Sequence, residues 1–396
     1  MDIQHLLCDR TRDLKVSGIR RILELGTKLD DPINLSIGQP DFRVPDAIKQ
    51  AAIDAITNDR NGYTLTQGIP ELRSRIESHL THDLGWSFGN DGDPEVMLTS
   101  GTSGALVLAF LALMGPGDEI IIPDPYFVMY PQLAAIFGGR AVRCETYPDF
   151  RMTAERLAPL ITERTKAVLF NSPSNPTGVV STRQECEDIL RLCRERGVLL
   201  ISDEIYDAFT FSDGLTDTMA NAPHTPVCPS PARHDPRAGE DVLVIRGFGK
   251  SYGITGWRMG YAAGPKALIA EMSKAQMYTF VCPPSIAQWG SLAAMDADIS
   301  AHVAEYESRR DMVVDVLGRV AKLPTPGGAF YAFVEIPESL GLTGTEFCER
   351  AIERNVLTIP GGVFSDRDTH IRLSFATRRD KLEQGIHILA EMLEGK

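Results

Sequence analysis

Seven runs of mostly apolar residues lie between residues 96 and 263 of this 396-residue chain, and segments with helical periodicity separate them. Continuous apolar strands that alternate with helices are typical of a mainly parallel sheet covered on both faces. The sequence therefore predicts an α/β fold whose large domain is a mainly parallel seven-stranded sheet between helices. The predicted strands are EVMLT, EIIIP, AVRCE, KAVLF, VLLIS, VLVIR and RMGYAAG.

A chain of this length is long for a single hydrophobic core, so two domains are expected. Outside the sheet region, helical patterns alternate with a few strand-like runs, which predicts a smaller α+β domain. The expected division is an N-terminal arm with part of the small domain at 1–45, a large domain at 46–284 and a small C-terminal domain at 285–396. The predicted helices outside the sheet cover 15–29, 46–57, 70–83, most of 265–321, 344–354 and 379–394, and the predicted strands cover 329–335 and 370–375.

Segment 212–241 is rich in Pro, Ala and Asp, and this composition predicts a long surface segment of unknown role.

The overall charge and the cysteine pattern restrict the partners and the compartment. A formal net charge of -13 argues against nucleic acid or an anionic membrane surface as a partner. No apolar run approaches the ~18 residues of a membrane span, and the charged N-terminus lacks a signal-peptide core. Seven scattered cysteines without a C-x-x-C motif fit reduced thiols. We expect a cytoplasmic protein with no membrane partner and no metal site.

A turn rich in glycine and hydroxyl groups, SGTSGAL, follows the first predicted strand and opens an apolar helix. Backbone N–H groups of Gly101, Thr102 and Ser103 at such a helix start can bind a phosphate. The same pattern is also explained by a simple helix cap at Thr102 or Ser103. Both interpretations stay open on the sequence.

Two further strand ends carry an aromatic ring and an amide. Phe127 in PYFVMY could stack on a planar cofactor, although an aromatic at this place is more often a core residue. Asn175 lies in NSPSNPTG, where the prolines stiffen the loop and hold the amide in one orientation.

Charged residues occur at the remaining strand ends. Asp203 in SDEIY follows a buried strand, so it needs a cationic partner or hydrogen bonds, unless it caps a helix. Tyr206 lies three positions later. Lys250 lies in a turn of small residues, where loss of water favours the neutral, nucleophilic amine, and Arg258 follows eight positions on.

Arg372, in HIRLSF, lies on a predicted buried strand of the C-terminal domain. A buried arginine needs an anion, and its planar fork suits a carboxylate. That carboxylate could be a structural Asp or Glu or part of a substrate.

The motifs SIGQPDF, YTLTQG, SGTSGAL, PYFVMY, NSPSNPTG, SDEIYDAF, RGFGKSYG, GWRMGY, PGGAFY and IRLSFA occur in this order. The whole set resembles the class I/II pyridoxal-phosphate aminotransferases of fold type I, and is most similar to their aspartate aminotransferase subgroup. The resemblance covers about residues 15–394, nearly the whole chain.

The resemblance implies how the cofactor is held. Lys250 would form the Schiff base with pyridoxal phosphate, and Asp203 would pair with the pyridinium N–H. Asn175 and Tyr206 would contact the ring hydroxyl, and Phe127 would stack on the ring.

The resemblance also implies a phosphate site at Gly101, Thr102, Ser103 and Arg258. Tyr63 would reach the phosphate in the neighbouring subunit of a homodimer, so that the active sites are shared.

The substrate carboxylate would be bound by Arg372, with help from Asn175 and the Gly38 backbone. The expected reaction moves an amino group from an L-amino acid to a 2-oxo acid by a ping-pong mechanism. Segment AQMYTFVCPPSIAQ carries no arginine that could hold a second carboxylate. Its Tyr278 and Phe280 favour a neutral or aromatic side chain, and aspartate stays open.

Two other functions are compatible with the same motifs. A carbon–sulfur β-lyase would keep the cofactor and change the reaction, and a binding protein would keep the fold without activity. The chain also departs from the family at two places, because Gly247 and Gly249 stand where serines often precede the lysine. One phosphate contact is therefore expected to be lost or replaced.

Overall fold

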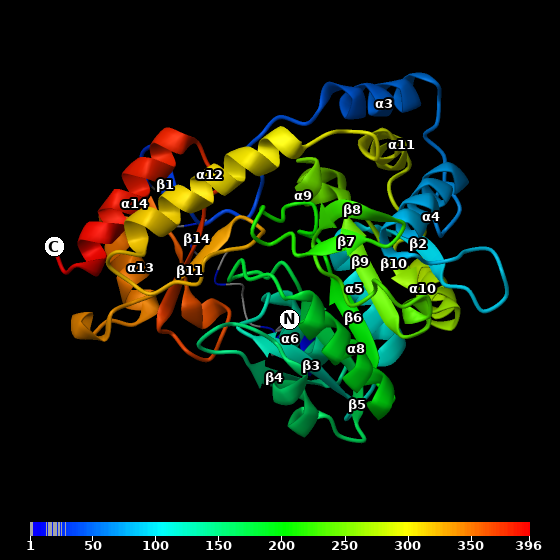
Figure 1. Cartoon of the computed structure of the whole chain (residues 1–396), viewed down its shortest axis with the longest axis horizontal. Helices are drawn as coiled ribbons and strands as arrows, with labels where there is room; N and C mark the ends of the chain where they lie inside the picture. Colours follow the sequence, from blue (N-terminus) through cyan, green and yellow to red (C-terminus); the bar gives the residue numbers. More distant parts are fainter. Residues whose placement is uncertain are drawn as a thin grey trace.

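The computed structural model describes residues 3–12, 14, 18, 22, 24, 26, 27 and 29–396, and Figure 1 shows the whole chain. Most of the helix predicted for 15–29 lies outside the described residues. A short helix α1 (Asp9–Arg12) lies near the N-terminus. None of the described helices is long and apolar enough to cross a membrane.

All seven predicted runs form one sheet, so the predicted fold class is confirmed. The strand order is β2-β10-β9-β6-β5-β3-β4. Strand β10 runs antiparallel to β2 and β9, and the other pairs are parallel. The strands are β2 (Glu95–Ser100), β3 (Glu119–Asp124), β4 (Arg140–Glu145), β5 (Thr165–Asn171), β6 (Leu199–Asp203), β9 (Val242–Gly247) and β10 (Met259–Gly264).

Helices cover both faces of this sheet because successive strand side chains point to opposite faces. Ala167 and Leu169 of β5 pack in the core formed with α5, α6 and α10. Val168 and Phe170 of the same strand pack in the core formed with α4 and α8. The helices in this part of the chain are α4 (Pro70–Leu84), α5 (Gly101–Leu113), α6 (Met129–Ile136), α7 (Ala154–Leu157), α8 (Arg183–Arg196) and α10 (Lys266–Thr279).

The C-terminal part forms a second core around a small antiparallel sheet (Figure 1). The N-terminal segment joins it, because β1 (Ile33–Asn34) pairs in parallel with β12 (Val356–Leu357). The long helix α12 lies against α14. The other elements here are β11 (Tyr331–Glu335), β13 (Ile359–Pro360), β14 (His370–Ser374), α12 (Ser300–Leu317), α13 (Gly344–Glu353) and α14 (Arg379–Leu393).

Helix α11 (Ser285–Ala294) packs against α3 (Asp46–Thr57) and α4, and two of its residues belong to the core of the large sheet. The domain division predicted at residues 45 and 284 stays a prediction.

Segment 212–241 differs from the prediction. It contains a hairpin of β7 (Asp217–Met219) and β8 (Ala222–Val227), and residues 223–226 are exposed as expected. The surface prediction is wrong for residues 228–233, which are buried. The Trp86 indole donates to the Ala232 carbonyl at 3.0 Å, and Arg233 pairs with Asp83. A composition rich in Pro and Asp does not show that this backbone is covered by α4 and its neighbours.

The register of the strands brings the predicted site to one edge of the sheet. Asn171 at the end of β5 lies opposite Asp203 at the end of β6, and Asp203 lies opposite Ile245 of β9. Because β10 is antiparallel, its first residue, Met259, lies opposite Ser100 at the end of β2. Arg258 therefore reaches the same edge as the carboxyl ends of the parallel strands.

Candidate active site

A cavity of about 280 Å³ lies at this edge, between the large sheet and the C-terminal part. All of the predicted site residues except Tyr63 line it. These are Gly38, Gly101, Thr102, Ser103, Phe127, Asn175, Asp203, Tyr206, Lys250, Arg258 and Arg372. Tyr63 is 89% exposed, so its predicted contact with a partner subunit stays a prediction.

The charged groups that line the cavity are strongly unbalanced. Lys250, Arg258 and Arg372 face a single carboxylate, that of Asp203. This local positive charge occurs in a chain whose net charge is -13. Arg372 is buried and Lys250 is half-buried, whereas Arg258 is exposed. A buried charge needs a partner, so the Arg372 end of the cavity in particular is suited to an anion.

Lys250 lies in α9 (Phe248–Ser251), a single helical turn directly after β9. Its Nζ donates a hydrogen bond to the Gly38 carbonyl. Burial, with the nearby charges of Arg372 and Arg258, lowers the pKa of Lys250 to about 8. The amine is therefore partly neutral near physiological pH and available as a nucleophile or base.

Arg372 on β14 is 2% exposed and has neutral hydrogen-bond partners. Its guanidinium donates to Asn175 Oδ1 at 3.0 Å and to the Ser36 carbonyl at 2.8 Å. It also lies 4.4 Å from the ring centre of Tyr331 and 4.7 Å from that of Phe364. Arg372 Nε has no hydrogen-bond partner, and in the described part of the chain no ion pair reaches this guanidinium. The structural Asp or Glu considered from the sequence is therefore not found there.

Asp203 is 3% exposed and accepts hydrogen bonds from Tyr130 Oη at 2.8 Å and Ile205 N at 3.3 Å. Burial raises the pKa of Asp203 to about 6 despite these bonds. Sequence reasoning missed Tyr130 and also Asn171, whose amide donates to the Asp203 carbonyl at 2.9 Å. The available signal was position, since Tyr130 lies three residues after Phe127 at the start of α6.

The start of α5 lines one end of the cavity. No side chain caps this helix, so the interpretation of Thr102 or Ser103 as a cap is wrong. The first N–H groups of a helix have no partner within it, and here Arg258 lies beside them. Gly101 has φ of 69°, and a Cβ atom there would lie 2.5 Å from Arg258 Nη2. Glycine is needed at this position for both reasons.

Aromatic residues form the remaining wall. Phe127 is half-buried, and its ring meets that of Tyr130 edge-on at 5.6 Å. Tyr206 Oη lies 2.9 Å from Tyr331 Oη, a residue that sequence reasoning also missed although it ends the PGGAFY string. A Cβ atom on Gly38 would lie 2.2 Å from Tyr331 Oη, so the backbone of Gly38 closely approaches this pair.

Together these residues offer an amine of lowered pKa, a buried carboxylate and two separate guanidinium groups. This set fits a planar carbonyl cofactor with a phosphate, together with a substrate carboxylate at Arg372. In the described residues, no group of three His, Cys, Asp or Glu side chains is arranged to hold a metal ion.

The chain is similar to known proteins over nearly its whole length. The sequence profile described as "Aminotransferase class I and II" matches residues 30–389. A probable aspartate aminotransferase of Methanocaldococcus jannaschii is 33% identical, over 98% of this chain and 100% of that protein. Aromatic-amino-acid aminotransferase 2 of Thermococcus litoralis is 32% identical, over 98% of this chain and 99% of the relative.

Among solved structures, the aspartate aminotransferase of Thermus thermophilus with maleate has a TM-score of 0.87 and is 33% identical. The alignment covers 97% of this chain and 99% of that one.

Proposed function

The chain belongs to the class I and II aminotransferases, a family that depends on pyridoxal phosphate, and we propose that its cavity binds this cofactor and a neutral or aromatic L-amino acid. The observation that carries this proposal is the charge balance of the cavity. Arg258 and Arg372 are separate cations, and Arg372 has no ion-pair partner among the described residues. A cofactor phosphate at the first and a substrate carboxylate at the second would neutralise both.

Residues of the large domain would hold the cofactor. The backbone of Gly101, Thr102 and Ser103, with Arg258, would bind the phosphate. The Phe127 ring would lie against the face of the cofactor.

Polar groups would then fix the cofactor's ring. Asp203 would accept a hydrogen bond from the ring nitrogen and keep it protonated, while Tyr130 holds the carboxylate in place. Asn175 and Tyr206 would donate to the ring hydroxyl. When bound, pyridoxal phosphate supplies an electron sink for the pair of electrons left at the amino acid Cα.

Lys250 would have two roles in this proposal. Its amine would be the group that holds the cofactor, and as a neutral amine it would take the proton from the substrate Cα. A pKa near 8 suits a base that must be neutral in part at physiological pH. Arg372, with Asn175 and the Gly38 backbone, would hold the α-carboxylate so that Cα lies near the amine.

We further propose a homodimer with shared active sites. Tyr63 and Leu65 are 89% and 62% exposed, and Met277 and Tyr278 are 50% and 86% exposed. Gln276 joins the two segments, because its amide donates to the Thr66 carbonyl at 2.6 Å. An exposed apolar surface of this kind is typical of an interface. Tyr63 would extend from it to the partner's phosphate site.

The substrate preference rests on segment 275–288, which contains no arginine. A dicarboxylate needs a second cation for its distal carboxylate, whereas Tyr278 and Phe280 suit an apolar side chain. Aspartate is the second candidate substrate. Separately, the scattered cysteines favour a cytoplasmic location. Single-turnover rates with phenylalanine, alanine and aspartate test the preference, and a fastest rate with aspartate would contradict it.

The central test is Lys250→Ala. We expect the visible absorbance of the bound cofactor to change and transamination to fall by about a thousandfold or more. Lys274→Ala, an exposed lysine paired with Glu271, is the matched control and should behave as wild type. A Lys250→Ala protein that transaminates at the wild-type rate would refute the proposed mechanism.

A further inference from the structure

A buried ion network lies on the other side of the strand ends that carry the active site. Arg246 is 4% exposed and precedes Lys250 by four residues. Its Nη2 contacts Glu204 Oε2 at 2.8 Å, its Nη1 contacts Asp83 Oδ2 at 2.8 Å, and its Nε contacts Asp207 Oδ2 at 3.1 Å. One guanidinium thus joins helix α4, the end of β6 and the end of β9.

Two of these carboxylates are sequence neighbours of active-site residues. Glu204 follows Asp203, and Asp207 follows Tyr206. Asp203 and Tyr206 line the active-site cavity, and Asp207 lines a second cavity that also contains Arg246. A single peptide unit therefore separates each of these two carboxylates from a residue that lines the active-site cavity.

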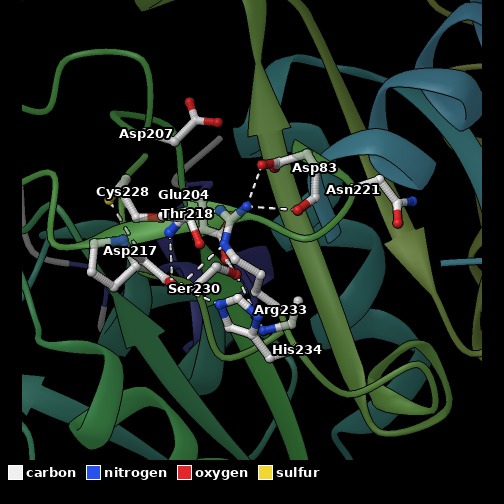
Figure 2. A network of polar contacts seen from close by, with 12 residues as sticks. Asp83, Glu204, Asp207, Asp217, Thr218, Asn221, Cys228, Ser230, Arg233 and His234 are labelled. Atoms are coloured by element: carbon white, nitrogen blue, oxygen red, sulfur yellow. Dashed lines mark hydrogen bonds and ion pairs between the residues drawn. The ribbon is translucent and has the colours of Figure 1, made fainter. Parts of the chain in front are cut away.

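Segment 212–241 completes this network, as Figure 2 shows around Asp83 and Glu204. Ser230 Oγ donates to Glu204 Oε1 at 2.6 Å. Arg233 Nη1 donates to the Asp83 carbonyl at 2.7 Å and pairs with the Asp83 carboxylate, while its Nε lies 3.4 Å from Asp217 Oδ2. Figure 2 also shows Ser230, Arg233 and His234 together beside these acidic residues.

We propose that Arg246 is a positioning residue for transamination, and that segment 212–241 supports it through Ser230 and Arg233. Arg246 ties the segment after β6, through Glu204 and Asp207, and helix α4, through Asp83, to the end of β9. This fixes the segment that carries Asp203 and Tyr206 relative to Lys250. The inference rests on the proposed function, because it assumes that Asp203 and Lys250 act together. Hydrogen bonds between charged groups are directional, and a misplacement of about 1 Å in an active site can lower the rate ~100-fold.

The test uses variants that conserve charge, so that an effect on Lys250 reports geometry rather than a lost charge. These are Ser230→Ala, Arg233→Lys and Arg246→Lys. In cofactor-free protein, the pH dependence of Lys250 acetylation is followed by peptide mass spectrometry. In the loaded enzyme, kcat and KM are measured with one amino acid at saturating 2-oxo acid.

We expect the acetylation midpoint of Lys250 to shift by about half a pH unit or more, and kcat to fall about tenfold with little change in KM. Arg194→Lys is the matched control, since Arg194 pairs with Asp235 and Asp241 at the far end of the same segment. It should leave both readouts unchanged.

A purely structural role would lower the melting temperature of the variants while the acetylation midpoint and kcat stay at wild-type values, and that result would overturn the proposal. If Arg246→Lys does not fold, the acetylation midpoint and kcat of Ser230→Ala and Arg233→Lys test the proposal instead. Failure of the proposed function is distinguishable, because wild-type protein would then show neither cofactor absorbance nor transamination. The acetylation midpoints in cofactor-free protein would still report whether the network positions Lys250.

Discussion

Two buried arginines on opposite sides of the same strand ends have opposite surroundings. Arg246 contacts the carboxylates of Asp83, Glu204 and Asp207. Arg372 donates only to neutral oxygens of Asn175 and Ser36 among the described residues. An uncompensated buried charge destabilises a fold, whereas a compensated one can hold segments in register. Arg246 therefore has a structural role within the protein, whereas Arg372 is free to pair with the carboxylate of a ligand.

The largest expected effect compares the two arginines in cofactor-free protein. Arg246→Met leaves three carboxylates without their shared cation, and we expect the free energy of unfolding to fall by about 3–5 kcal/mol. Arg372→Met removes a buried charge that has no counterion, so we expect a change below about 1 kcal/mol or a gain in stability. Denaturant unfolding at pH 7 measures both. If both variants lost the same free energy of unfolding, the two arginines would not differ in how well the protein compensates their charge.

The next effect concerns activity. Arg372→Met removes the proposed partner of the substrate carboxylate, and we expect kcat/KM to fall about 100-fold, because charged hydrogen-bonded partners typically contribute ~2–5 kcal/mol. The loss should be similar for phenylalanine and alanine, since both carry the α-carboxylate. Cofactor binding, followed by absorbance titration, should stay close to wild type. If Arg372→Met lost the cofactor but kept its affinity for the amino acid, Arg372 would bind the cofactor and not the substrate carboxylate.

A third prediction concerns Lys250, the cation on the active-site side, and the pH dependence of the free energy of unfolding. The folded-state pKa of Lys250 is about 8, against an ordinary value of 10.5. The unfolded chain therefore binds more protons between these values, and the stability of the cofactor-free protein rises with pH in that window. We expect Lys250→Met to stabilise the protein at pH 7 and to lose about 2 kcal/mol of that advantage by pH 10.

The measurement is chemical unfolding of wild type and variant at several pH values from 7 to 10. Lys274→Met, at an exposed site, serves as the control and should show no such trend. A stability difference for Lys250→Met that does not change with pH would mean that the buried amine keeps its ordinary pKa.

The fold and most of the cavity could be predicted because their signals are local. Each strand of the large sheet is one apolar run, and the parallel arrangement brings the residues after those runs to one edge. Asp203 and Lys250 could be singled out in this way. Arg372 lies on β14 of the small antiparallel sheet, and its need for an anion could be predicted from the sequence. Whether the protein itself provides that anion could not.

The network behind the site could not be predicted, because it depends on pairs far apart in sequence. Arg233 and Asp83 are separated by 150 residues, and Arg246 and Glu204 by 42. Tyr130 was missed for the same reason, since its contact with Asp203 spans 73 residues. Composition alone assigned residues 228–233 to the surface, although neighbouring elements bury them.

The smallest expected effect concerns the two glycines before Lys250, which line different cavities. Gly249 lines the active-site cavity, and a Cβ atom there would lie 3.5 Å from Thr255 Cα, an ordinary contact. Gly247 lines the second cavity, and a Cβ atom there would lie 2.9 Å from Ile205 Cδ1 and 3.0 Å from Thr102 Cγ2. A serine is therefore tolerated at the first position and crowded at the second.

We expect Gly249→Ser to add one hydrogen bond to the cofactor phosphate and to lower its dissociation constant about three- to tenfold, as a bond of ~1 kcal/mol would. Gly247→Ser should raise the dissociation constant, because Thr102 at the start of α5 must move. Absorbance titration of cofactor-free protein measures both. If Gly249→Ser weakened binding as much as Gly247→Ser, the phosphate would lie away from Gly249. The proposed phosphate site would then consist of Arg258 and the α5 N–H groups alone, with no contribution from a side chain at position 249.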